Sequence, residues 1–149
     1  MRLSDLLLRD SVIVPLRAES REEAIRLLAH ASALPSACQD ELELAALARE
    51  RGGSSGIGSG MALPHGACDH IAAPILACGR AAAAIDFKSS DGEPATLLFL
   101  LAVPKKRFYC HLYPLSALSL LPSDRRLLAR LNAAPSVDEF FKLIAGMPV

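Results

Sequence analysis

The chain has 149 residues, 52% of them hydrophobic, and its sixteen Lys and Arg residues balance sixteen Asp and Glu residues. This length and composition predict one folded domain over residues 1–149 and exclude a disordered chain. The balanced charge argues against a dedicated nucleic-acid-binding protein, which usually carries a basic excess.

We expect neither membrane insertion nor export. The apolar run at 95–104 is far shorter than the roughly 20 residues that a membrane-spanning helix needs. The first ten residues include Asp5 and Asp10 and lack the apolar core of a signal peptide. The four cysteines form no C-x-x-C pair, which predicts reduced thiols in a cytoplasmic protein.

Strand and helix signals are mixed along the chain. In chain order they predict a strand over 11–16, helices over 20–34 and 36–53, strands over 60–64, 74–80, 81–87 and 95–103, and helices over about 110–121, 123–133 and 136–145. The run 95–103 does not alternate polar and apolar residues, which suits a strand buried on both faces. Together these elements predict one α/β domain with helices outside the strands.

A glycine-rich loop, GGSSGIGSG, occupies residues 52–60. Its GGSSG segment matches the G-x-S-x-G pattern of a hydrolase elbow, but that elbow needs a strand before it and a helix after it, and here the predicted order is reversed. The loop also lacks the Lys-Ser/Thr of a Walker A motif. It is therefore either a simple turn or a loop whose successive backbone N–H groups bind an anion.

The segment HGACDH at 65–70 brings together two histidines, a thiol and a carboxylate. This spacing matches no standard set of metal ligands, so a metal site is the weaker alternative and no metal or other cofactor is expected.

His65 lies between Pro64 and Gly66 at the end of a predicted strand. The proline restricts the backbone before the histidine, and we expect the glycine to permit an unusual turn and to leave space beside the ring. A neutral imidazole held in this way can attack phosphorus and form a labile phosphoramidate. The alternative is a structural histidine bonded to a backbone carbonyl.

Other polar residues can support such a reaction. Pro114 is tolerated only in the first turn of a helix, so the helix should begin near Cys110 or His111 and place His111 at its positive end. Arg49 precedes the glycine loop and either holds a phosphate or compensates a helix dipole. The basic cluster Lys105–Arg107 is more simply a solvated loop.

With these residues identified, almost the entire chain resembles the mannitol/fructose-class enzyme IIA domain of the bacterial phosphotransferase system (the type-2 class), and within it the nitrogen-regulatory branch. The motifs that carry the resemblance are LARERGGSSGIGSGMALPHG (47–66), IDFKSSDGEPATLLFLLAVP (85–104) and His111 with the leucines that follow it. The resemblance implies a mixed central β-sheet flanked by helices on both faces. It also implies no metal or nucleotide cofactor.

The resemblance further implies that His65 accepts a phosphoryl group from a histidine-containing phosphocarrier protein. It assigns His111, Arg49 and Ser55 to the same active site. This chain departs from the family pattern in having Ser55 in place of threonine, Ala67 after the Pro-His-Gly motif, KKRFYC before His111, and Pro114 and Pro122 in the helical region.

Three functions follow from this resemblance. The first is a regulator of nitrogen or potassium metabolism, whose phosphorylation changes its binding to target proteins. The second is a sugar-specific enzyme IIA that passes the phosphoryl group to a IIB domain. The third is a degenerate binding module that is no longer phosphorylated. The chain length, with no IIB or IIC domain attached, favours the regulator.

Overall fold

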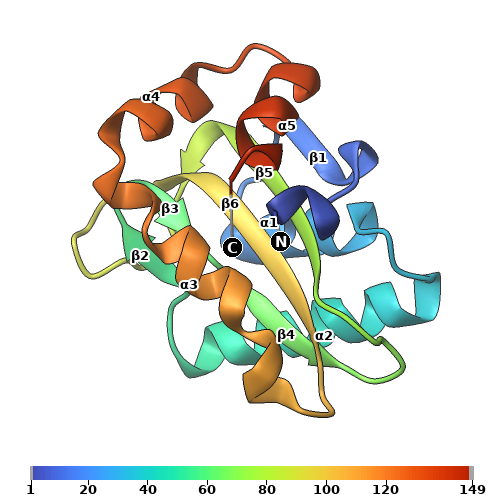
Figure 1. The fold of residues 1–149 in the computed structure, drawn as a ribbon. Helices are drawn as coiled ribbons and strands as arrows, with labels where there is room; N and C mark the ends of the chain where they lie inside the picture. Colours follow the sequence, from blue (N-terminus) through green and yellow to red (C-terminus); the bar gives the residue numbers. More distant parts are fainter. Residues whose placement is uncertain (1, 148–149) are drawn as a thin grey trace.

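The computed structural model describes residues 2–147, which form a β-sheet with helices packed on it (Figure 1). The strands are β1 (Val12–Leu16), β2 (Gly56–Gly58), β3 (Met61–Ala62), β4 (His65–Cys68), β5 (Ile75–Ile85) and β6 (Ala95–Pro104). The α-helices are α1 (Arg21–Ala31), α2 (Ser36–Gly52), α3 (Tyr113–Ser119), α4 (Arg125–Ala133) and α5 (Val137–Ala145). Short 3₁₀ helices are η1 (Leu3–Asp5), η2 (Arg9–Ser11), η3 (Phe108–His111) and η4 (Leu121–Ser123). Within the described residues, no helix combines the length and the apolar character needed to cross a membrane.

The sheet is mixed, as the family resemblance implies. Its strands follow the order β1, β5, β6, β3, β2, and β4 also pairs with β6. The β5–β6 and β2–β3 pairs are antiparallel, and the remaining pairs are parallel. The strands β3 and β4 therefore follow one another along a single edge of β6, with Leu63 and Pro64 between them.

The central strand β6 supplies side chains to both faces of the sheet. Its residues Leu97, Phe99, Leu101 and Val103 join one apolar core, and Leu98, Leu100 and Ala102 join the other. The first core also contains residues of α3, α4 and α5, and the second contains residues of α1 and α2. Helices on both faces and a doubly buried strand over 95–103 were both predicted, and both are confirmed.

Several predicted boundaries are wrong. The two strands expected over 74–80 and 81–87 are one strand, β5, with a shift in register between Arg80 and Ile85. The strand expected over 60–64 ends at Ala62, so His65 begins a strand and does not follow one. The helix expected over 123–133 begins at Arg125 instead, and its N-cap is Asp124, whose side chain accepts the Leu127 N–H.

The expected helix over about 110–121 is also different in the structure. Arg107 has a left-handed backbone (φ 61°), and the 3₁₀ helix η3 follows it. Leu112 (φ −87°, ψ 0°) then separates η3 from α3, which begins at Tyr113. Pro114 does lie in the first turn of α3, as expected. Backbone N–H groups of a first turn have no partner within the helix, so a residue without an N–H is tolerated there.

Gly66 has a role that differs from the one expected. Its backbone is not in the left-handed region; instead, α2 passes so close that a Cβ here would lie 2.9 Å from both Ala45 Cβ and Ala46 N. The glycine thus allows α2 to pack directly on β4, which brings the end of that helix beside His65.

We predict that Gly66→Ala destabilises the fold by about 1–3 kcal/mol, because the backbone of α2 must shift to admit the methyl group. Urea-induced unfolding measures this loss of free energy. Gly52→Ala is the matched control, since a Cβ at Gly52 meets no atom within 4 Å. Equal stability of the two variants would contradict the close-packing account.

Candidate active site

A cavity of about 310 Å³ lies where the end of α2, the glycine-rich loop, the start of β4 and α3 meet. Its lining contains the predicted residues Arg49, Ser55 and His65, together with Ser54, Ile57, Leu63, Leu115, Ser116 and Ser119. Three of the four predicted site residues thus lie around one cavity, although they come from different elements of the fold.

The orientation of the His65 ring follows from the interruption between β3 and β4. Pro64 lacks an N–H, and its carbonyl accepts the Leu101 N–H at 3.0 Å, so the edge of β6 stays paired across the break. The His65 Nδ1 lies 3.2 Å from the carbonyl oxygen of Leu63. Because a carbonyl oxygen only accepts, Nδ1 carries the proton, and the neutral ring keeps its lone pair on Nε2.

The surroundings of His65 also favour its neutral form. Burial lowers the pKa of His65 below its ordinary value, and the charge of Arg49 lowers it further. The hydrogen bond to Leu63 and the charge of Glu50 act in the opposite direction, but the net shift is downward. At neutral pH the ring is therefore a nucleophile and not an imidazolium.

Glu50 is a buried carboxylate that the sequence analysis did not identify as part of the site. It is 3% exposed, and its two oxygens accept the Ser55 N–H at 3.2 and 3.1 Å. Arg21 of α1 donates to the same carboxylate at 3.3 Å. The Arg-Glu pair before the glycine loop was the available signal, but a glutamate at a helix end usually faces water.

Ser55 lies beside this carboxylate and lines the cavity. Its side chain is buried, and its hydroxyl oxygen has no hydrogen-bond partner among the described residues. A buried hydroxyl without a partner is costly, which makes it a ready donor to an oxygen atom that enters the cavity.

The N–H groups of the loop are less available than expected. The Ser55 N–H is bound by Glu50, and the Gly56 N–H donates to Ser54 Oγ at 2.9 Å. Ser54 Oγ in turn donates to the carbonyl of Phe87. These two N–H groups hold the loop in shape and are not free to bind an anion.

Arg49 lines the cavity and also bonds to its own helix end. Its guanidinium donates to the Gly53 carbonyl at 2.8 Å, which ties the side chain to the start of the loop. A guanidinium has five N–H donors, so this bond leaves others for a phosphoryl oxygen.

His111, the fourth predicted residue, is not among the side chains that line the cavity in the described structure. It is the last residue of η3 and lies two positions before α3, so it does not begin an α-helix as expected. The reason is the left-handed turn at Arg107, which produces a 3₁₀ helix first.

The segment HGACDH does not gather metal ligands. No group of three His, Cys, Asp or Glu side chains is placed to hold a metal ion within residues 2–147. Asp69 instead forms an ion pair with Lys105 at 3.2 Å, and its N–H donates to Glu41. Lys105 is thus engaged in an ion pair with both carboxylates.

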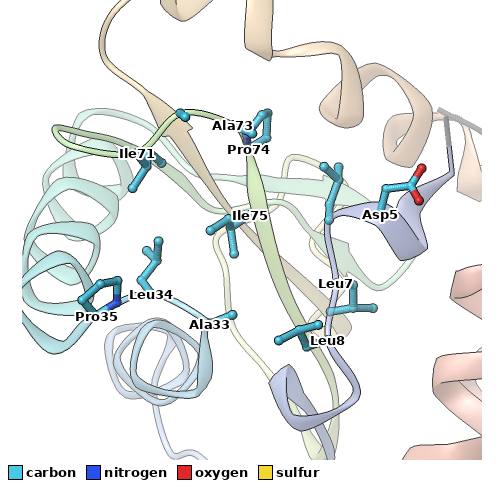
Figure 2. Close-up of a pocket in the computed structure, with 12 residues that line it drawn as sticks. Asp5, Leu7, Leu8, Ala33, Leu34, Pro35, Ile71, Ala73, Pro74 and Ile75 are labelled. Carbon is cyan, nitrogen blue, oxygen red and sulfur yellow. The ribbon is translucent and has the colours of Figure 1, made fainter.

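A second cavity, of about 380 Å³, lies between the N-terminal segment, the α1–α2 connection and the β4–β5 connection (Figure 2). Side chains such as Leu7, Leu34, Pro74 and Ile75 make its lining mainly apolar, and Asp5 is the one charged residue among the lining residues within 2–147. Among the described residues that line it there is no histidine, and no cation to stabilise a phosphoryl group, so the cavity beside His65 is the candidate active site.

Comparison with known proteins identifies relatives of the whole chain. A family model described as "Phosphoenolpyruvate-dependent sugar phosphotransferase system, EIIA 2" matches residues 5–147. The chain is 30% identical over 148 residues to the nitrogen regulatory protein of Escherichia coli (strain K12), and the match covers 97% of this chain and 90% of that protein.

Two further matches cover nearly all of the chain. It is 30% identical over 148 residues to the fructose-specific EIIABC component of the phosphotransferase system of Bacillus subtilis (strain 168), covering 97% of this chain and 23% of that protein. The crystal structure of nitrogen regulatory protein IIA-Ntr from Neisseria meningitidis has the same fold, with a TM-score of 0.83 at 26% identity, covering 95% of this chain and 98% of that chain.

We predict that Glu50→Gln lowers the free energy of unfolding by about 1.5–3 kcal/mol. The reason is that a neutral amide replaces the buried carboxylate that accepts hydrogen bonds from Arg21 and from the Ser55 N–H. Urea-induced unfolding measures the loss. Glu22→Gln is the matched control, since Glu22 bonds to the same Arg21 at 3.3 Å but is exposed, and such pairs contribute about 0–1 kcal/mol. Similar losses in both variants would show that the Glu50 carboxylate does not organise the loop.

Proposed function

This chain belongs to the EIIA type-2 family of the phosphoenolpyruvate-dependent sugar phosphotransferase system, and on that basis we propose that it carries a phosphoryl group on His65. The donor in this proposal is a histidine-containing phosphocarrier protein. The observation that supports it most strongly is that His65 lines one cavity with Arg49 and Ser55. A structural histidine would also bond to a backbone carbonyl, but here the bond from Nδ1 to Leu63 leaves the Nε2 lone pair available for attack beside these donors.

The proposed transfer is an in-line displacement at phosphorus. The Nε2 lone pair of neutral His65 forms a new P–N bond while the P–N bond to the donor histidine breaks. The donor ring keeps the electron pair of the broken bond, so the phosphoryl group moves without a net change in proton count. The lowered pKa of His65 supports this step, because protonation would occupy the attacking nitrogen.

Two cavity residues are suited to stabilise the charge that develops on the equatorial oxygens. Ser55 can donate its hydroxyl hydrogen, and the guanidinium of Arg49 can donate to an adjacent oxygen. We also assign a stabilising role to His111, on the basis of the family resemblance and its place at the end of η3, two residues before α3.

We propose that the role of the transfer is mainly regulatory, in the cytoplasm. The nitrogen regulatory protein of E. coli matches this chain over 90% of its own length. A phosphoryl group adds roughly −1.5 to −2 charges. Placed beside Arg49, this charge would change which protein surfaces the cavity rim attracts, and so would switch binding to regulated proteins.

The principal alternative is sugar uptake. The B. subtilis relative is a fructose-specific EIIABC component, which supports a route in which the phosphoryl group passes from His65 to a IIB domain. The degenerate module remains the third candidate, and an unreactive His65 would favour it.

The proposal predicts one acid-labile phosphoryl adduct, seen by intact mass at mildly alkaline pH with phosphoenolpyruvate, enzyme I and the phosphocarrier protein. His65→Ala should abolish the adduct, and His111→Ala should slow its formation. Ser55→Ala should slow it about 10²–10³-fold, because it removes one donor to the developing charge. Since the Ser55 hydroxyl has no hydrogen-bond partner within residues 2–147, this variant should keep its stability to urea.

Ser54→Ala is the matched control for Ser55→Ala. Ser54 Oγ already donates to the Phe87 carbonyl and accepts the Gly56 N–H, so its hydroxyl hydrogen is not available to a phosphoryl oxygen. Its loss should therefore lower stability but should not slow formation of the adduct as Ser55→Ala does. Absence of an adduct on the wild-type chain, with an active phosphocarrier in the same assay, would overturn the proposed transfer.

A further inference from the structure

Exposed apolar side chains gather beside the His65 cavity. Among the described residues, the exposed large hydrophobic side chains are Leu8, Leu44, Ile57, Tyr109 and Leu120. Two of these belong to segments that border the cavity, and a third lies in η3, which precedes α3 in the chain. Ile57 (40% exposed) lines it, Leu120 (69%) follows the lining residue Ser119, and Tyr109 (87%) lies in η3.

This apolar surface continues along α3. A separate hollow of about 570 Å³, which is not the cavity of Figure 2, shares Ser116 with the His65 cavity. It is lined mainly by apolar groups, including Ala117, Leu120 and Met147. A contiguous exposed apolar patch rimmed by polar residues is typical of a protein interaction site.

The charged side chains beside this surface are mostly basic. Arg49 and Arg51 lie at the end of α2, and Lys106 and Arg107 lie directly before η3. All four are exposed, and none forms an ion pair with another described residue.

The segment that carries Lys106 and Arg107 is close to the active site. The Cys68 carbonyl accepts the Lys105 N–H at 3.0 Å, and Cys68 is three residues along β4 from His65, or about 10 Å. The chain then returns through η3 to Leu115, which lines the cavity. An interface of ordinary size centred on His65 would therefore extend to the segment that carries these basic side chains.

Nearby carboxylates offset only part of this charge. Glu50 is buried and bound by Ser55 and Arg21. Glu41 and Asp69 both form ion pairs with Lys105. Asp124 lines the hollow along α3, where it accepts the Leu127 N–H, and Asp91 accepts the Ser59 N–H of the glycine-rich loop. Among the described residues, the four cations have no ion-pair partner, and they outnumber these two carboxylates.

We propose that the phosphocarrier protein that docks over His65 presents acidic side chains around an apolar patch, and that Lys106 and Arg107 select it by charge. This inference rests on the proposed function for the identity of the partner. A nucleic acid is a poorer fit, because the exposed apolar surface would remain uncovered and the chain as a whole has no basic excess. Complementary charge at an interface rim raises the association rate and suppresses partners of the wrong sign.

The test compares two forms of one unphosphorylated phosphocarrier protein: a form with basic side chains around its active histidine, and a variant with two of them replaced by Glu. Calorimetric titration measures Kd for each at low salt and in roughly 0.5 M salt. We expect the acidic form to bind at least about 10-fold more tightly at low salt. The difference should shrink to less than about 3-fold at high salt, where charges are screened.

The double variant Lys106→Glu/Arg107→Glu should reverse this preference. Its matched control is Arg17→Glu/Arg26→Glu, which makes the same change in net charge on exposed residues before and within α1, on the face of the sheet opposite α3. The control should keep the preference of the wild-type chain, and circular dichroism checks that both variants fold.

Equal affinity for the two phosphocarrier forms, or a preference for the basic form, would overturn the proposal. A second result would also overturn it: the Lys106→Glu/Arg107→Glu variant loses binding to a single-stranded oligonucleotide that the wild-type chain binds, but keeps the wild-type preference between the two phosphocarrier forms. Because Kd is measured without transfer, the result is independent of whether His65 is phosphorylated. An adduct formed from phosphoramidate on both double variants shows separately that the acceptor is intact.

Discussion

A carboxylate buried at the end of α2 joins the segments that form the active site. Glu50 binds Arg21 of α1 and the N–H of Ser55, so it connects two helices to the glycine-rich loop. Burying a carboxylate is expensive unless charged partners and donors compensate it, and here both are present. The fixed loop then places the Ser55 hydroxyl against the cavity, where no group in the described part of the chain forms a hydrogen bond with it.

The nucleophile depends on a different constraint, the interrupted strand along β6. Leu63 and Pro64 separate β3 from β4. The carbonyl of Leu63, in this interruption, accepts a hydrogen bond from His65 Nδ1. Gly66 then lets α2 approach β4 closely enough to bring Arg49 and Glu50 beside the ring. The site thus combines a loop held by a buried charge with a ring held by the backbone.

Sequence patterns predicted the parts of this structure that local rules determine. The doubly buried strand β6 follows from its unbroken apolar run, and the place of Pro114 in α3 follows from its missing N–H. Glu50 could not be predicted in this way, because its burial depends on Arg21, 29 residues earlier in the chain. The role of Gly66 depends on the approach of α2, and the position of His111 depends on the left-handed turn at Arg107.

The most direct test of this account is the site of phosphorylation within the His65 ring. Nitrogen-15 and phosphorus-31 NMR of the phosphorylated chain, labelled at its histidines, identifies which ring nitrogen carries the phosphoryl group. The hydrogen bond from Nδ1 to Leu63 predicts a phosphoryl group on Nε2, with Nδ1 still protonated. A phosphoryl group on Nδ1 would contradict the account, because the ring would have to give up the bond that orients it.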